Sequence, residues 1–503
     1  MKVKSIIALS LAMLFTTACT DLDENLYDKV EAGNYGKSAG EIETIVGRAY
    51  ASLRGFSDAS SGGTHAYPAS EYVYFLTALT SDEAALPTRV GGDWYDGGQY
   101  LDLQYHTWTP DNKVIWSAWK YNYAGISSVN AVLYQVEQSG LTEDEKSKIF
   151  AELRAVRAYY YYNLLDLFGN VPIITDYNVT DLPANSTREQ VYNFIESELL
   201  DIIDLLPATG YGRMTQNAGN MLLARLYLNS EVFIGQARWQ DCINVTDKID
   251  GTLEADYFAN FQTNNEVSRE IIFAIPYDHK AGTVGNYMPS MTFHYEQKWA
   301  FSPTGSYQWC GNGMTAKPGI YRMFDENDIR RKSVLIGDQI NLSTGSVIIM
   351  PASGEPLTYT DTITDITNAK QNEGARLFKY EVRPDDAWER DNDLVIMRYA
   401  EVLLMKAECY VRTGSPAAAR PLVELVRSRA GLSTPDDITL EFLNSELKKE
   451  FLFESHRRTD NIRFGTFFEP WWNKSTTPSY RSIFPIPSYE LQKNTNLKQN
   501  SGY

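Results

Sequence analysis

The chain has 503 residues, with 64 acidic against 46 basic side chains and a formal net charge of −18. Such an acidic protein repels phosphate groups, so nucleic acid and anionic lipid headgroups are excluded as principal partners. Hydrophobic residues make up 43% of the sequence, which predicts a globular protein large enough to bury most of its core. Because Cys242, Cys310 and Cys409 are far apart and form no CxxC motif, neither a disulfide framework nor a zinc site is indicated.

The N-terminal segment has the features of a secretory signal peptide. Two lysines precede an apolar run from Ile6 to Phe15, and Thr16-Thr17-Ala18 leads to Cys19. The run is about half the length of roughly 20 residues that spans a bilayer. Small residues before a cysteine are the pattern that a lipoprotein signal peptidase cleaves. We therefore predict that residues 1–18 are removed and that Cys19 is the site of lipid attachment, followed by an acidic, flexible tether.

Apolar residues recur with helical spacing in both halves of the chain. We expect helices at 114–136, 146–168, 188–206, 217–228, 398–412, 417–430 and 440–456. Short links such as Gly414-Ser415-Pro416 favour antiparallel helix pairs, the unit of a tetratricopeptide-like scaffold. The consensus of that repeat is absent, so the periodicity alone predicts helix pairs and no more.

The composition changes between about residues 250 and 395, where Gly, Pro, Asn, Thr and aromatic residues are scattered. Only brief strand-like runs occur there, at 270–275 and 346–350. We therefore expect one mostly α domain over 19–503, with a helical scaffold at 19–250 and 395–503 and a loop-rich ligand-binding region between them. Binding residues concentrate on loops that a rigid scaffold positions.

Aromatic residues make up 13% of the chain, including 33 Tyr and 10 Trp. Aromatic faces pack against sugar rings, while Asp, Asn, Gln and Arg form hydrogen bonds with hydroxyls, so this enrichment suits a carbohydrate binder. It equally suits a protein whose helices pack through tyrosine side chains. Composition leaves both interpretations open.

The loop at residues 81–102 is the first candidate ligand site because it combines charged residues, Trp94 and four glycines. Trp94 is predicted to stack on a sugar ring, and Asp82 and Arg89 to hold its hydroxyls, with Asp96 beside them. The alternative is an acidic surface turn in which Trp94 packs locally.

Three further segments supply candidates for glycan contacts. The segment 299–313 contributes Trp309, Cys310 and Asn312, and the charged segment 388–393 contributes Arg390. Asp58 lies in a Gly- and Ser-rich loop. The segment 388–393 is also compatible with a solvated turn or a calcium site, but it does not match the calcium-loop pattern. We predict no metal and no cofactor.

The sequence lacks the local signatures of common enzymes. The five histidines form no HExxH motif, and neither a G-x-S-x-G elbow nor a P-loop occurs. A glycosidase stays open only because the separation of paired carboxylates is invisible in a sequence. We expect a binding protein and not an enzyme.

Four segments resemble the SusD/RagB family of Bacteroidetes nutrient-binding lipoproteins. They are LRAVRAYYYYNLLDLFGNVPII from Leu153, RYAEVLLMKAE from Arg398, ELKKEFLFESHRRTDNIRFG from Glu446 and FPIPSYELQKNTNLKQNSGY from Phe484. The family often has Glu-Gly where this chain has Glu454-Ser455. The acidic residues after Cys19 also resemble the signal by which such lipoproteins reach the cell surface.

The resemblance implies a SusD-like fold, a lipid anchor in the outer membrane, and a cell-surface subunit that delivers oligosaccharide to a SusC-like TonB-dependent transporter. It implies no catalysis. The RagB branch implies peptide ligands instead, and a protein-interaction scaffold is the remaining alternative. The four segments are helices and turns, so they transfer no ligand residues to this chain.

Overall fold

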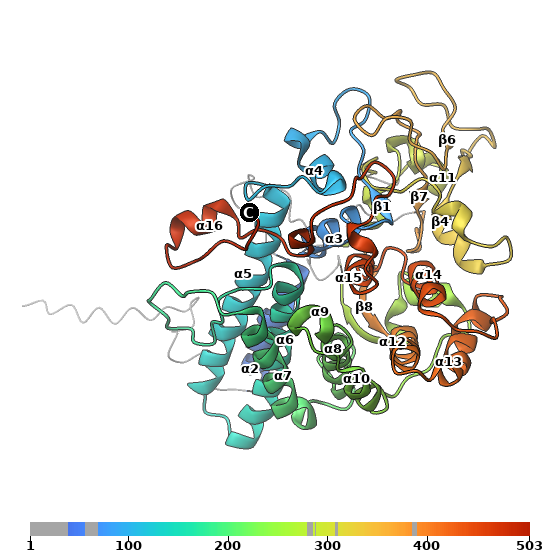
Figure 1. The fold of residues 1–503 in the computed structure, drawn as a ribbon. Helices are drawn as coiled ribbons and strands as arrows, with labels where there is room; N and C mark the ends of the chain where they lie inside the picture. The colour runs from blue at the N-terminus through green and yellow to red at the C-terminus, as the bar shows by residue number, and fades with distance from the viewer. Residues whose placement is uncertain (1–38, 56–68, 279–284, 287, 307–309, 385–389) are drawn as a thin grey trace, which may run out of the picture.

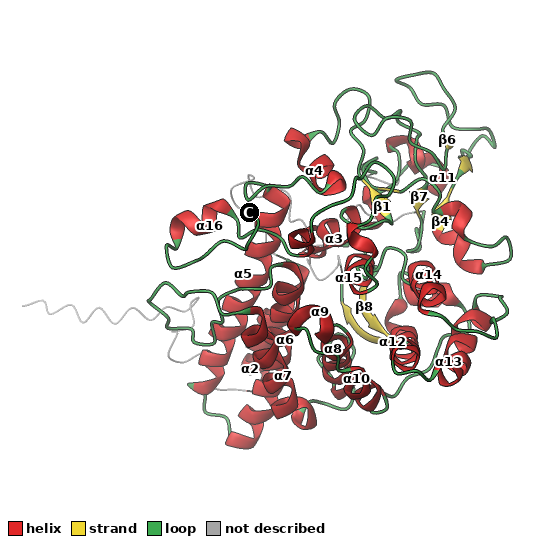
Figure 2. Ribbon diagram, viewed as in Figure 1, coloured by secondary structure: helices red, strands yellow, loops and turns green. Residues whose placement is uncertain are grey.

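The computed structural model describes residues 39–55, 69–278, 285–286, 288–306, 310–384 and 390–503. Helices dominate these residues (Figure 2), as predicted. The helices are α2 (Ala39–Ala51), α3 (Ala69–Leu79), α4 (Gln99–Tyr105), α5 (Lys113–Glu137), α6 (Glu143–Leu167), α7 (Arg188–Ile202), α8 (Gln216–Leu228), α9 (Ser230–Ile234), α10 (Trp239–Thr246), α11 (Lys298–Phe301), α12 (Tyr399–Arg412), α13 (Pro416–Arg429), α14 (Leu440–Glu450), α15 (Arg457–Arg463) and α16 (Ser488–Lys493).

The strands are short and pair antiparallel in two-stranded sheets. The pairs are β1 (Ala84–Ala85) with β3 (Thr315–Ala316), β2 (Ile271–Ile275) with β8 (Leu394–Arg398), β4 (Val334–Leu335) with β7 (Arg376–Leu377), and β5 (Gly337–Asp338) with β6 (Thr358–Tyr359). The predicted strand at 270–275 is confirmed as β2. The predicted strand at 346–350 is wrong, because this segment makes only isolated bridges at Val347 and Ile349.

Consecutive helices pack side by side, which confirms the predicted helix pairs. α5 packs against α6, α6 against α7, α8 against α10, and α12 against both α10 and α13. Figure 1 shows these helices below and to the left of a loop-rich part, which holds α4, α11 and the short strands β1, β4, β6 and β7. None of the helices in the described ranges has both the length and the apolarity to cross a bilayer.

Local sequence signals explain where the two longest helices begin and end. Asn112 caps α5 by accepting hydrogen bonds from the backbone of Val114 and Ile115, and Thr142 starts α6 with a capping box to Glu145. α6 ends before Gly169, whose φ of 71° reverses the chain. The tyrosines at 159–162 on α6 are all buried, so this cluster belongs to the core.

The predicted helix at 440–456 is too long. α14 ends at Glu450, and α15 begins at Arg457. The turn between them contains Phe453 and Ser455 in the left-handed region, with φ of 61° and 66°. Ser455 therefore adopts a left-handed conformation that glycine would adopt without steric cost.

Replacing Ser455 with glycine is expected to raise the free energy of unfolding by about 0.5–1 kcal/mol, because glycine removes the cost of the left-handed conformation. Ser455→Ala keeps that cost and is the matched control, expected to be no more stable than the wild type. Urea unfolding followed by circular dichroism measures both variants. A Ser455→Gly protein less stable than Ser455→Ala would contradict this interpretation of the turn.

Charged residues of the C-terminal segments form a buried ion network. Glu450, fully buried, accepts hydrogen bonds from Arg330 at 2.9 Å and Arg398 at 2.6 Å, and it also pairs with Arg429. Arg398 further pairs with Glu454 at 2.7 Å. Burial alone raises the pKa of the Glu450 carboxyl, but the three guanidinium groups outweigh it and hold the pKa below the ordinary range. These charges fix how the C-terminal helices pack together.

Candidate ligand-binding site

Three loops from distant parts of the sequence meet above the helices. The strand pair β1–β3 joins the loop at 81–102 to residues 315–316, and a parallel bridge joins Arg89 to Ala369. The amide of Val90 also donates to the carbonyl of Ala369 at 2.9 Å. Residues 81–102, 310–316 and 366–376 therefore form one unit, which we call the loop junction.

Arg89 lies at the centre of the loop junction and has no exposed surface. Its guanidinium donates to the carbonyls of Asn312 at 3.1 Å, Lys370 at 2.9 Å, Glu373 at 2.8 Å and Gly313 at 3.3 Å. Burial, and then repulsion by Arg376, lowers the pKa of Arg89. The predicted contact of Arg89 with sugar hydroxyls is corrected: this side chain positions the loops.

Asn312 and Cys310 are also internal. Asn312, fully buried with a φ of 49°, accepts a hydrogen bond from Arg376 at 2.9 Å and donates to Gln371. Cys310 packs in a small apolar cluster with Phe293, and burial raises the pKa of its thiol to about 12. Neither side chain faces a ligand surface, so their predicted glycan contacts are corrected to structural roles.

The side chains of Asp82, which is partly exposed, and Arg390, which is buried, are likewise engaged by other residues of the protein. Asp82 pairs with Lys448 at 2.7 Å and Arg457 at 2.6 Å, tying α3 to the C-terminal helices. Burial raises the pKa of Asp82, but these two cations outweigh that effect and lower the pKa below its usual range. Arg390 is 1% exposed and donates to the Ser290 hydroxyl at 2.9 Å. The predicted hydroxyl contact of Asp82 and the predicted glycan contact of Arg390 are corrected in the same way.

The turn at residues 90–98 carries the accessible aromatic side chains of the loop junction. Trp94 is partly exposed, has a φ of 60° and donates its indole N–H to the carbonyl of Gly311 at 2.7 Å. Its ring lies over Gly313, where a Cβ would come within 2.8 Å. Tyr95 is 54% exposed, and Asp96 is exposed beside it. Trp94 is thus anchored by its edge, and Tyr95, which is not among the predicted contact residues, is the more exposed aromatic residue of this turn.

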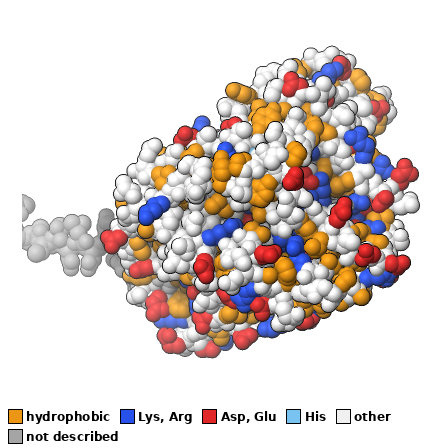
Figure 3. Space-filling model, viewed as in Figure 1, with side chains coloured by type: hydrophobic (Ala, Val, Ile, Leu, Met, Phe, Trp, Pro, Cys, Tyr) orange, Lys and Arg blue, Asp and Glu red, His pale blue; other side chains and the backbone are white. Residues whose placement is uncertain are grey.

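Several predicted residues lie outside the described residues: Cys19, Asp58 and Trp309. In the parts of the chain that are described, no group of three or more His, Cys, Asp or Glu side chains is arranged to hold a metal ion. The view in Figure 3 shows acidic and basic side chains interspersed with apolar ones, without a large area of one charge.

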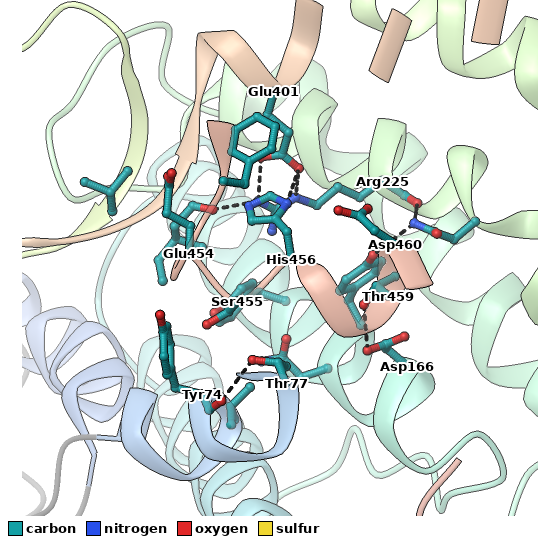
Figure 4. A pocket seen from close by; sticks show the side chains of 18 of the residues that line it. Tyr74, Thr77, Asp166, Arg225, Glu401, Glu454, Ser455, His456, Thr459 and Asp460 are labelled. Carbon is teal, nitrogen blue, oxygen red and sulfur yellow. Dashed lines mark hydrogen bonds and ion pairs between the residues drawn. The ribbon is translucent and has the colours of Figure 1, made fainter. Parts of the chain in front are cut away.

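An internal cavity of about 110 Å³ lies between α3, α6, α12 and the turn before α15. Figure 4 shows its polar lining, in which Tyr74 faces Ser455 and His456 lies beside Glu401. Glu401 pairs with Arg225 at 2.6 Å. Burial lowers the pKa of His456, against the opposing effect of Glu401. Ligand pockets usually measure about 300–1,000 Å³, so this cavity has room for a few water molecules and not for a sugar.

Comparisons with known proteins agree with this architecture. A family model described as "SusD family" matches residues 255–480, and one described as "Starch-binding associating with outer membrane" matches residues 63–228. The chain is 27% identical to the starch-binding protein SusD of Bacteroides thetaiotaomicron, covering 82% of each protein. It is 26% identical to SusD-like protein P2 of Formosa agariphila, covering 98% of each.

Solved structures show the same fold. Surface glycan-binding protein A of Bacteroides uniformis superposes with a TM-score of 0.75 at 21% identity, covering 92% of this chain and 99% of that one. The same-named protein of Bacteroides thetaiotaomicron, solved in complex with laminarihexaose, gives a TM-score of 0.74 at 23% identity over 92% and 99%. The predicted mostly α fold is therefore confirmed.

Proposed function

This chain belongs to the SusD/RagB family, and from that premise we propose that it is a glycan-binding protein of the outer membrane that captures oligosaccharide without cleaving it. The observation that carries the proposal is the extent of the match: relatives named for starch or glycan binding align with most of the chain. The exposed aromatic turn at the loop junction supplies the chemistry that a sugar ring needs.

We place the glycan at Trp94, Tyr95 and Asp96. Tyr95 offers an open ring face, and the partly exposed Trp94 is held by its bond to Gly311. Asp96 supplies a carboxylate for sugar hydroxyls. Arg89 and Asn312 hold the turn from below through the carbonyl and amide bonds of the loop junction, so the ring faces are fixed before a ligand arrives. Asp58 and Trp309 stay predicted contacts.

The proposal includes delivery to a SusC-like TonB-dependent transporter and anchoring through a lipid on Cys19. Both rest on the family and on the signal sequence. The full chain is expected in the outer-membrane fraction with a bound fatty acid, and Cys19→Ala is expected to lose both. Copurification of the full chain with an outer-membrane transporter tests the partnership.

The glycan proposal is tested by isothermal titration of residues 20–503 with laminarihexaose, maltohexaose and a peptide pool. Tyr95→Ala is expected to weaken binding of the recognised hexasaccharide about tenfold, roughly 1.4 kcal/mol, because the open stacking surface is lost. Trp94→Ala is expected to weaken it at least as much, but it also removes the bond to Gly311. Tyr95→Ala is therefore the cleaner variant.

Tyr489→Ala is the matched control, since Tyr489 is 48% exposed on α16, where its ring contacts Trp116 of α5, and α16 lies apart from β1 in Figure 1. It is expected to bind like the wild type. Equal loss in Tyr489→Ala and Tyr95→Ala would remove the loop junction as the site. Release of shorter sugars would overturn the non-enzymatic proposal, and binding of peptides alone would move the chain to the RagB-like alternative.

A further inference from the structure

A second hollow, of about 310 Å³, lies on α5 and α6 beside the segment that follows α6. Its lining includes Leu133, Tyr134, Phe150, Arg154, Asp176 and Tyr177. It is remote from the loop junction: Asn112, the cap of α5, donates to the carbonyl of Gln99 at 3.0 Å, whereas Tyr134 lies about 33 Å farther along the helix at 1.5 Å per residue.

Two exposed tyrosines form one side of this hollow. Tyr134 is 42% exposed and Tyr177 is 52% exposed. Their ring centroids are 5.4 Å apart, with 30° between the ring planes. Two rings in this arrangement support each other and leave outer faces open to solvent. Exposed apolar surface that is rimmed by polar residues is typical of binding sites, so this pair is a candidate ligand surface.

Buried polar side chains hold the segment that carries Tyr177. Asn130, 3% exposed, donates to the carbonyl of Ile174 at 3.0 Å. The hydroxyl of the fully buried Tyr161 accepts from the Ile174 amide at 2.6 Å and donates to its carbonyl at 3.1 Å. Arg157, 5% exposed, donates to the carbonyl of Thr175 at 3.2 Å. The wall of the hollow is therefore fixed in advance, which reduces the entropic cost of binding.

The rim of the hollow is polar while its floor is apolar. Leu133 and Phe150 are partly buried at the floor. Glu137 and Asp176 are exposed at the rim, and Arg154 is fixed there by Glu198 at 2.8 Å and Asp201 at 2.7 Å. Aromatic faces combined with carboxylate and guanidinium groups match a sugar, which has apolar ring faces and a circumference of hydroxyls.

We propose that the hollow at Tyr134 and Tyr177 is a second carbohydrate site, which holds another part of the same glycan chain that the loop junction captures. This inference rests on the proposed function. The volume lies at the lower end of the range for small-ligand pockets, so the site takes one or two sugar units. A polysaccharide long enough to reach both sites binds with an avidity that a short oligosaccharide lacks.

The test compares a short and a long form of one glucan on residues 20–503. Hexasaccharide affinity is measured by titration with laminarihexaose or maltohexaose, and polymer affinity by retardation in native gels containing laminarin or starch. Tyr177→Ala and Tyr134→Ala are each expected to lower polymer affinity about tenfold while hexasaccharide affinity stays within twofold. Tyr177→Phe keeps the ring and is expected to retain polymer binding. Both alanine variants change exposed side chains, and an unchanged melting temperature confirms folding.

The outcomes separate this site from the loop junction. If Tyr177→Ala and Tyr134→Ala still bind the polymer like the wild type, the second site is overturned and the proposed function is unaffected. The same conclusion follows if the exposed control Tyr489→Ala loses as much polymer affinity as these two variants. The carbohydrate site is also overturned if a peptide binds the wild type but not Tyr177→Ala, while no sugar binds at the hollow. If the wild type binds no glucan in either form and no other glycan, the proposed function itself fails.

Discussion

Replacing Glu450 with alanine is expected to lower the free energy of unfolding by about 3–5 kcal/mol, the usual cost of breaking a buried ion network on one side. The variant leaves Arg330, Arg398 and Arg429 close together without their shared carboxylate. The free energy of unfolding of a whole domain is only about 5–15 kcal/mol, so this loss removes a large part of it. Urea unfolding of residues 20–503 measures the loss.

The same helix provides the control for this prediction. Glu441 lies exposed in the first turn of α14, so Glu441→Ala removes a carboxylate of the same helix at a cost below about 1 kcal/mol. A Glu450→Ala protein that unfolds within 1 kcal/mol of the wild type would show that the network contributes little to stability.

Replacing Gly125 with alanine is expected to destabilise the protein by about 2 kcal/mol or more, although alanine is the better helix former. A Cβ on Gly125 would lie 2.1 Å from Cζ of Tyr160. The ring has no room to retreat, because Tyr160 is fully buried and its hydroxyl bonds to the hydroxyl of Ser52 at 2.7 Å. α5 and α6 must therefore separate to accept the methyl group.

Gly47 in α2 is the matched control for the alanine substitution. It is exposed, and nothing lies within 4 Å of a Cβ built there. Gly47→Ala is expected to stabilise the protein by about 0.5–1 kcal/mol through helix propensity alone. Thermal unfolding of the two variants should shift the melting temperature in opposite directions. A shift in the same direction would mean that α5 and α6 tolerate the extra methyl group.

Helices with strong periodicity and clear boundaries could be predicted from the sequence. α5 and α6 were predicted from the spacing of their apolar residues, and Gly169 marks the end of α6. The predicted start at 146 is three residues too late, because the capping box at Thr142 was not used. The break after Glu450 could not, because it depends on Phe453 and Ser455 adopting left-handed conformations that only tertiary contacts stabilise. β8 was not predicted, because the short apolar run at 394–398 gains its strand conformation from pairing with the distant β2, while the predicted helix at 398–412 agrees with α12.

The candidate site was predicted at the level of loops and not of side chains. Glycines and charges identified the loop at 81–102, but a charge in a loop does not reveal whether its partner is a ligand or another part of the chain. Asp82 pairs with Arg457, which is 375 residues away in the sequence, and Arg89 donates to the carbonyl of Asn312, which is 223 residues away. One sequence signal could have predicted that some of these charges pair inside the protein. Acidic residues recur every fourth position at Glu446, Glu450 and Glu454 beside apolar residues, and this spacing suits a buried ion network.

Residues 484–503 pack against the N-terminal half of the molecule. The side-chain amide of Asn500 donates to the carbonyls of Phe168 and Phe484, both at 2.8 Å, and the indole of Trp108 donates to the hydroxyl of Tyr503 at 2.8 Å. These partners are separated by as many as 395 residues. α5 and α6 therefore make these contacts only when residues 484–503 pack against them. Contacts between residues so far apart in the sequence slow folding, and partly folded chains that lack them expose apolar surface that favours aggregation.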